Sequence, residues 1–262
     1  MRKILTILFL LMIAPQGCFA DICTGLNTYW KFDEASTGLC GTATSGTILD
    51  SSGNANTGNC TAQAGTNYVA GEIGVGAISN GGGSAWIIAN NTPTISGSFT
   101  VSAWINVVDN NDREVIDTRT PSDNSFDLQI EAGSTVHSDV GTGSSWINTS
   151  ANATCNYTAG TWFHVAEVVT PTGFTIYCNG SSVGSGTWAS NTPLLMDGTH
   201  KLNVGGPSPY MDGDLDDVRI YSRALSSSDI TDLYNYTSGS CSVTDSTTLN
   251  GTTTIQDGAT IN

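Results

Sequence analysis

The first residues whose types and spacing could do chemistry are the carboxylates Glu114, Asp117, Asp127 and Glu131. Retaining glycosidases need two carboxyl groups about 5 Å apart beside the scissile bond. Glu114 and Asp117 are three residues apart, so in a regular strand they point to opposite faces and cannot share a substrate. Asp127 and Glu131 can share a face, but no third carboxylate completes a row at two-residue spacing. The spacing therefore argues against a hydrolase, and we expect no catalytic residues.

Nucleophilic and zinc chemistry find no support either. His137, His164 and His200 are isolated, and no Ser or Asp partner stands near any of them in a recognisable motif. No CxxC pair or spaced Cys/His set appears, so a cysteine-bound metal cluster is not expected.

Aromatic residues beside polar loops offer a different chemistry, because the C–H faces of sugar rings stack on Trp and Tyr. The four aromatic residues that adjoin Gly/Ser/Asn loops, and that we expect to bind a ligand, are Trp86, Trp146, Trp188 and Tyr210. The alternative is that each side chain only anchors its own loop by packing.

The acidic balance restricts the partners. The formal net charge is −15, and removal of an N-terminal leader carrying Arg2 and Lys3 would make it two units more negative. Such a chain is repelled by nucleic acid and by anionic membrane surfaces. Neutral sugars and divalent cations remain open as ligands, and the acidity also serves solubility.

Strands must position these residues, and residues 161–184 give the clearest pattern. Two alternating apolar runs flank Pro171-Thr-Gly173, which predicts a β-hairpin with a three-residue loop. This register places Glu167 on the opposite face from Phe174 and Ile176. We prefer it because a two-residue loop would bury an unpaired carboxylate among apolar side chains.

The rest of the chain indicates an all-β domain from about Asp21 to Cys241. The clearest interior strand is Phe99–Val107, which includes Trp104 as a packing residue. Residues 109–143 predict polar loops with short strands over 115–118 and 126–130. Residues 226–235 predict one short helix capped by Ser226.

Five stretches together resemble the laminin-G-like, concanavalin-A-like lectin/glucanase jelly-roll family. In chain order they are Tyr29-Trp-Lys-Phe-Asp-Glu34, Asp50-Ser-Ser-Gly-Asn54, Ser98-Phe-Thr-Val-Ser-Ala-Trp-Ile105, Trp162-Phe-His-Val-Ala with Ile176-Tyr-Cys-Asn-Gly, and Gly213-Asp-Leu-Asp-Asp-Val-Arg-Ile-Tyr-Ser-Arg-Ala-Leu225. The resemblance implies an all-β, two-sheet antiparallel jelly-roll sandwich with one short C-terminal helix. It implies no single activity, because one fold hosts many.

The N-terminus predicts export. Arg2 and Lys3 precede an apolar run over residues 4–14, and Cys18-Phe-Ala20 presents small residues at a cleavage site. We expect residues 1–20 to be a signal peptide, a secreted or cell-surface location, and no transmembrane segment in the mature chain. A lipid-anchored start at Cys18 is the alternative, although Pro15 stands where such signals carry a leucine-like residue. Residues 242–262 predict a flexible Thr/Gly-rich tail.

Removal of the leader leaves six cysteines, for which the sequence alone allows 15 pairings. The resemblance puts the first and last strands side by side, which implies Cys23 with Cys241. The pairs Cys40 with Cys60 and Cys155 with Cys178 are then local.

The family resemblance also implies a structural Ca²⁺ near the first and last strands, with Asp50 and Asp216 as ligands. The alternative is that Asp50 caps its turn and Asp216 accepts backbone N–H groups.

We therefore expect a secreted, non-catalytic carbohydrate-binding module whose partner is an extracellular glycan. A structural or adhesive module that contacts a surface protein is the close alternative, and a glycoside-active enzyme is a more distant one.

Overall fold

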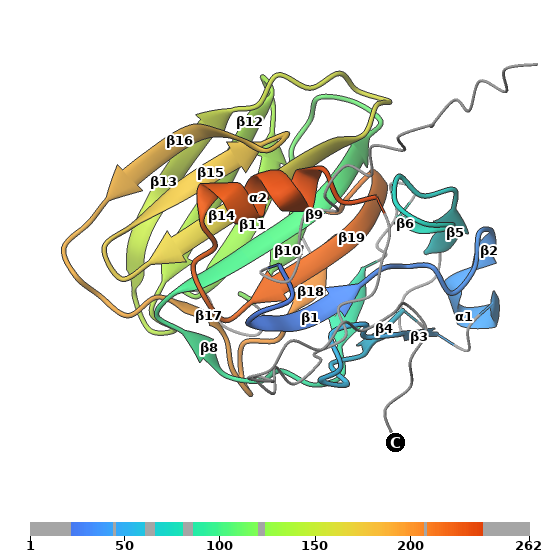
Figure 1. The fold of residues 1–262 in the computed structure, drawn as a ribbon, viewed down its shortest axis with the longest axis horizontal. Helices are drawn as coiled ribbons and strands as arrows, with labels where there is room; N and C mark the ends of the chain where they lie inside the picture. Colours follow the sequence, from blue (N-terminus) through green and yellow to red (C-terminus); the bar gives the residue numbers. More distant parts are fainter. Residues whose placement is uncertain are drawn as a thin grey trace, which may run out of the picture.

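The computed structural model describes residues 22–43, 46–60, 66–80, 86–119, 124–206 and 209–237. Two antiparallel sheets pack face to face, and a short helix lies on the outside of one of them (Figure 1). The predicted all-β jelly-roll sandwich with a C-terminal helix is confirmed.

The larger sheet has nine strands. From edge to edge it contains β16 (Ser181–Thr187), β15 (Gly173–Cys178), β14 (Phe163–Thr170), β9 (Phe99–Val107), β19 (Gly213–Tyr221), β6 (Ala77–Ser79), β5 (Asn67–Val69) and β2 (Gly38–Leu39), with β1 (Leu26–Trp30) also paired to β19. The expected interior strand thus has the predicted bounds, and the closing strand β19 lies beside both it and the first strand.

The other sheet has eight strands. In order it contains β13 (Trp146–Thr154), β12 (Thr135–Gly141), β11 (Phe126–Glu131), β10 (Arg113–Asp117), β18 (Asn203–Val204), β7 (Ile87–Ala89), β4 (Gly58–Asn59) and β3 (Thr47–Ile48), and β17 (Leu194–Met196) and β8 (Ile95–Ser96) form a separate pair. Alternate residues such as Leu128 and Ile130 face the apolar layer between the sheets. Their neighbours face away from it.

The C-terminal helix α2 (Ser227–Tyr234) lies across the outer face of the nine-stranded sheet (Figure 1). Ser226 and Asp229 form the predicted capping box, each side chain accepting from the other's backbone N–H. Tyr234 stacks on Trp104 with ring centroids 5.5 Å apart. Trp104 is therefore a packing residue, as expected.

The hairpin β14–β15 exists, but the predicted register is wrong. Thr170 pairs with Gly173, so the loop has two residues, and Glu167 lies opposite Ile176 in the layer between the sheets. The carboxylate is not unpaired there, because the Ser138 hydroxyl donates to it from the eight-stranded sheet at 2.7 Å. Gly173 does not adopt a left-handed conformation. Glycine is needed there because β16 passes very close to it: a Cβ on residue 173 would lie 2.3 Å from the Gly186 carbonyl oxygen.

Strands β12 and β13 were not expected, because the sequence over residues 109–143 indicates polar loops. β12 alternates buried Val136, Ser138 and Val140 with polar residues, and the polar strand β13 is an edge. Gly184 belongs to β16, the edge strand of the other sheet. It lies so close to β13 that a Cβ added to it would be 2.7 Å from the Cβ of Ala153. The edges of the two sheets meet there.

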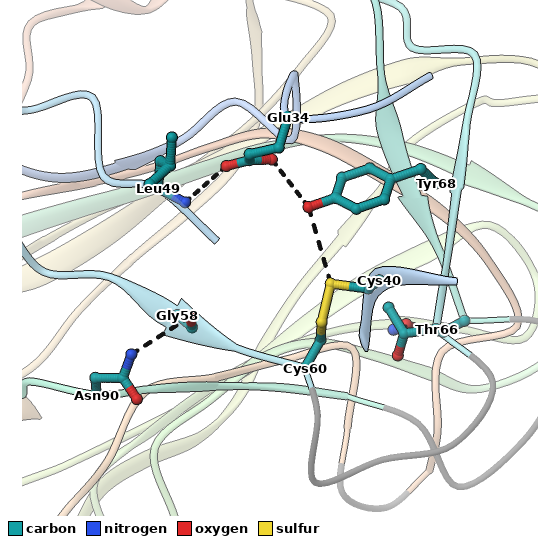
Figure 2. Close-up of a disulfide and its surroundings, with 9 residues drawn as sticks. Glu34, Cys40, Leu49, Gly58, Cys60, Thr66, Tyr68 and Asn90 are labelled. Carbon is teal, nitrogen blue, oxygen red and sulfur yellow. Dashed lines mark hydrogen bonds between the residues drawn. A yellow bond between two sulfur atoms is a disulfide. The ribbon is translucent and has the colours of Figure 1, made fainter. Parts of the chain in front are cut away.

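Two predicted disulfides are confirmed, Cys40–Cys60 and Cys155–Cys178, with Cα–Cα distances of 6.2 and 5.7 Å. Around the first, the Tyr68 hydroxyl lies 3.8 Å from Sγ of Cys40 and donates to Glu34 (Figure 2). The disulfide links Cys40, the first residue of the one-turn helix α1 (Cys40–Ala43), to Cys60, the residue that follows β4.

Several predictions fall on residues outside the described ranges. The signal peptide over residues 1–20 and the tail over 242–262 are among them. Cys23 is disulfide-bonded, but Cys241, its predicted partner, lies outside the described residues. Within the residues that the structure describes, no helix is long and apolar enough to cross a membrane.

Candidate functional site

Eight polar side chains form a grid on the face of the eight-stranded sheet that points away from the other sheet. They lie in two cross-strand rows of directly opposed residues, which are Asn203, Asp117, Asp127 and Asp139 in the first and Glu114, Gln129, His137 and Asn152 in the second. Directly opposed residues present their side chains on the same face of a sheet. We call these eight residues the polar face.

The expectation that Glu114 and Asp117 point to opposite faces is wrong. A register shift between Glu114 and Ile116 places one extra residue in β10, so Glu114 pairs with Gln129 and Asp117 pairs with Asp127. Gln129 and Asp127 are two apart and share a face. The β-bulge therefore brings the two carboxylates onto the polar face together.

Hydrogen bonds connect the carboxylates of the polar face. Nε2 of Gln129 lies 3.1 Å from both Oε2 of Glu114 and Oδ2 of Asp127. Asp117 accepts from the amide of Asn203 at 2.9 Å. Asp127 also accepts a hydrogen bond from the Arg119 guanidinium at 2.5 Å, which places a positive charge beside this cluster.

Burial controls the protonation of these groups. Glu114, Asp117 and Asp127 are 2, 3 and 0% exposed. Loss of solvent raises the pKa of Glu114 well above its usual range, with a further increase from Asp127, and raises that of Asp117 to about 6. The pKa of Asp127 is also raised by burial. The inner part of the polar face thus favours protons or other cations.

His137 lies on the more accessible side of the polar face. Nδ1 is 2.6 Å from Oδ1 of Asn152, and Nε2 is 3.1 Å from Oδ1 of Asp139. The hydrogen bond to Asp139 raises the pKa of His137 to about 9. One ligand atom each from Asp127, His137 and Asp139 lies within 4.8 Å of the others, which makes this trio able to hold a metal ion.

Among the aromatic candidates, Trp146 adjoins the polar face. It begins β13 opposite Gly141, and the Arg119 guanidinium carbon lies 5.1 Å from the centre of its ring. Because Arg119 also binds Asp127, the ring and the carboxylates are linked through one side chain. Trp146 is half-buried, so part of its surface is open to a ligand.

Trp86 and Tyr210 form a second aromatic feature. Their rings stack with centroids 5.8 Å apart, and both are half-buried. The Glu114 N–H donates to the carbonyl of Pro209, the residue before Tyr210. The loop that carries Tyr210 therefore lies against the start of β10, at the end of the polar face.

Trp188 is placed elsewhere. Its ring stacks on Phe174 at 5.9 Å, and Nε1 donates to the Pro171 carbonyl at 3.0 Å in the β14–β15 loop. A depression of about 290 Å³ lies nearby, lined mainly by Thr, Ser and Gly residues of β14 to β16. Trp188 thus follows β16 of the nine-stranded sheet and packs against the core between the two sheets.

The two expected calcium ligands both accept hydrogen bonds. Asp50 accepts from the N–H groups of Tyr29, Ser52 and Asn56 and from the Ser52 hydroxyl. Asp216 accepts from the N–H groups of Glu72, Ile73 and Asp217, and burial raises its pKa to about 8. These are the roles that the alternative reading gave them, and calcium binding stays a prediction.

Sequence reasoning missed Gln129, Asp139, Asn152, Asn203 and the site role of His137. The signal available was His137-Ser-Asp139, a pair at two-residue spacing that shares a strand face. It was overlooked because β12 was interpreted as part of a polar loop.

One family model matches the part of the chain that forms most of the two sheets. The family model described as the concanavalin A-like lectin/glucanases superfamily matches residues 80–231. The chain belongs to this superfamily. The region that the family model matches contains the whole polar face. A search among curated protein sequences finds no match.

Solved structures of the same fold include carbohydrate complexes. One is domain 4 of AbnA, a GH43 extracellular arabinanase from Geobacillus stearothermophilus, in complex with arabinotriose, at 22% identity and a TM-score of 0.61, with 80% of this chain and 98% of that chain covered. Another is the ligand-binding domain of botulinum neurotoxin serotype D in complex with N-acetylneuraminic acid, at 17% identity and a TM-score of 0.62, with 83% of this chain covered. The chain spans about half of that toxin domain, 52%. At these identities the likeness concerns the fold.

Proposed function

We propose that the chain is an extracellular, non-catalytic carbohydrate-binding module that holds a glycan on the accessible side of the polar face. The observation that carries the proposal is the half-buried Trp146 ring, which lies against Arg119, the side chain that also reaches Asp127 and Asp139 of the polar face. Sugars are bound by this combination of an aromatic surface and clustered hydrogen-bonding groups. Two solved structures of the fold, with arabinotriose and with N-acetylneuraminic acid, support the ligand class.

The extracellular location is supported by the disulfides, which persist in oxidising compartments. The acidic charge makes a neutral glycan a better ligand than a polyanion.

A non-catalytic role is favoured by the burial of the carboxylates. Glu114, Asp117 and Asp127 are nearly inaccessible, and all three accept hydrogen bonds from protein groups. A substrate cannot reach them without movement of their neighbours. A glycosidase remains the second candidate, because the bulge places Glu114 and Asp117 on one face.

The test is retention of the mature protein on a broad array of neutral glycans and insoluble polysaccharides. We expect dissociation constants from micromolar to millimolar, about −4 to −8 kcal/mol, because few contacts must offset the ordering cost. Trp146→Ala should abolish retention, and Tyr210→Ala should weaken it. Trp188→Ala is the matched control, since it removes an aromatic ring from the other sheet.

Two outcomes would replace the proposal. If no glycan retains the wild type, the structural or adhesive module that contacts a surface protein takes its place. If the protein releases reducing sugar and Glu114→Gln stops the release, the protein is a glycosidase.

A further inference from the structure

Asp127, His137 and Asp139 form a compact donor set in the centre of the polar face. Asp127 of β11 is directly opposite Asp139 of β12, and His137 lies two residues before Asp139 on the same face. One ligand atom from each lies within 4.8 Å of the other two. Two carboxylates and an imidazole from rigid adjacent strands are thus already brought together.

The imidazole is oriented by its neighbour on β13. Nδ1 of His137 lies 2.6 Å from Oδ1 of Asn152, which directs Nε2 toward Asp139. Metal-binding histidines typically donate their other ring N–H to an oxygen in this way, which fixes the ring and the tautomer. Asn152 can provide that support.

A separate observation concerns Glu114, which lies on the polar face and is 2% exposed. Its Oε1 has no hydrogen-bond partner among the described residues, while Oε2 and Asp127 bond to the same amide nitrogen of Gln129. An unpartnered buried oxygen is costly. Gln129 links Glu114 to Asp127, so a positive charge near this oxygen would offset the cost of its burial.

Arg119 supplies only part of that charge. It contacts Asp127 at 2.5 Å and Asp139 at 3.6 Å. Together with Glu114 and Asp117, these two residues make four carboxylates in the cluster. Its side chain is 31% exposed and lies against the Trp146 ring. A divalent ion could therefore replace the guanidinium.

We propose that the chain binds one divalent transition-metal ion of the zinc class through a carboxylate oxygen of Asp127, Nε2 of His137 and a carboxylate oxygen of Asp139. An imidazole with carboxylates suits zinc and its neighbours, whereas calcium prefers oxygen ligands alone. Binding displaces Arg119 and any proton on Nε2, and water completes the coordination. This site is separate from the calcium expected at Asp50 and Asp216, and it does not depend on glycan binding.

The test is calorimetric titration of the EDTA-treated and dialysed mature protein with Zn²⁺, without glycan. We expect saturable binding of one equivalent that millimolar calcium does not displace. Asp139→Asn and His137→Gln should weaken it at least tenfold. Asn152→Ala should weaken it several-fold while folding normally, because Asn152 is exposed.

Two further variants make the result specific. Arg119→Gln should tighten Zn²⁺ binding several-fold, because it removes the competing cation. His200→Gln is the matched control and should change nothing. His200 lies 3.0 Å from Asp197, but among the described residues it belongs to no group of three possible metal ligands. Melting temperatures in EDTA verify that each variant is folded.

The proposal is overturned if neither the wild type nor Arg119→Gln shows saturable binding up to millimolar Zn²⁺. It is also overturned if Asn152→Ala and His137→Gln, both folded, bind Zn²⁺ as the wild type does. Failure of glycan retention alone would contradict only the proposed function.

Discussion

The hydroxyl of Ser138, on β12 of one sheet, donates a 2.7 Å hydrogen bond to Oε1 of Glu167, on β14 of the other. This bond crosses the apolar layer of the sandwich. The other carboxyl oxygen of Glu167 has no partner among the described residues. Because the side chain is fully buried, loss of solvent raises the pKa of Glu167 to about 8.

A stability difference that depends on pH follows from Glu167. The folded chain keeps the proton up to about pH 8, whereas the unfolded chain releases it near the ordinary value of 4.5. Between these values the unfolded state binds fewer protons, so this group makes the protein less stable as pH rises, by at most about 1.4 kcal/mol per unit. Below and above that window its contribution is constant.

We expect Glu167→Gln to remove this loss while keeping an acceptor for Ser138. Relative to the wild type, the variant should be unchanged near pH 4 and more stable by about 2–4 kcal/mol at pH 8.5 in urea denaturation. Glu131→Gln, at a side chain that is 37% exposed, is the control and should show no such trend. A difference independent of pH would contradict the buried protonated carboxyl.

The buried ion pair of Arg219 and Asp217 gives a second prediction. The guanidinium is 2.9 Å from the carboxylate and lies between the rings of Tyr29 and Tyr236, each 4.1 Å away. Asp217→Asn leaves a buried charge unpaired, so we expect a loss of about 3–5 kcal/mol in the free energy of unfolding.

That loss should persist in high salt, because buried charges are poorly screened. Asp109→Asn breaks the more exposed pair with Arg113 and should cost at most about 1 kcal/mol. Equal losses in the two variants, measured by chemical denaturation, would show that the Arg219 pair does not have the expected role.

Each confirmed disulfide should stabilise the fold by restricting the unfolded chain. The cysteines are 20 residues apart in Cys40–Cys60 and 23 apart in Cys155–Cys178, so replacing either pair by Ala should cost about 3 kcal/mol. Reduction of the wild type should therefore lower the melting temperature markedly. Intact-mass analysis that finds six alkylatable thiols in the native secreted protein would remove this prediction.

The calcium prediction is tested through Asp50. If calcium binds there and at Asp216, millimolar calcium should raise the melting temperature above that in EDTA, and Asp50→Asn should abolish the difference. Asp50→Asn should also destabilise the protein by about 2 kcal/mol in EDTA, because the amide keeps only one of the two acceptor oxygens, which bond to the N–H groups of Tyr29 and Asn56. An identical melting temperature in calcium and EDTA would contradict calcium binding.

Local signals that agree with the fold were sufficient to predict several elements. The run Phe99–Val107 has a strand's composition and is a strand, and Ser226 with Asp229 caps α2. Cys40 and Cys60 were paired correctly once the family resemblance had ordered the strands. In each case the residues that decide the structure are neighbours or belong to a recognised motif.

The failures have a different cause, because they depend on contacts between distant residues. The register at Glu167 depends on Ser138, whose strand was not predicted. The face of Glu114 depends on a bulge that has no marker such as glycine in its own sequence, Arg113–Asp117. Of the proposed aromatic residues, only Trp146 contacts a side chain that binds the polar face, and its partner Arg119 could not be inferred from spacing.

The bulge in β10 also bears on how relatives should be compared. A protein with Glu-x-Asp in a regular strand would present the same two carboxylates on the same face as Glu114 and Asp117 do here. Deletion of one residue at Val115 would therefore restore a regular strand and leave both carboxylates on the polar face. A one-residue gap in an alignment here can mark preserved chemistry.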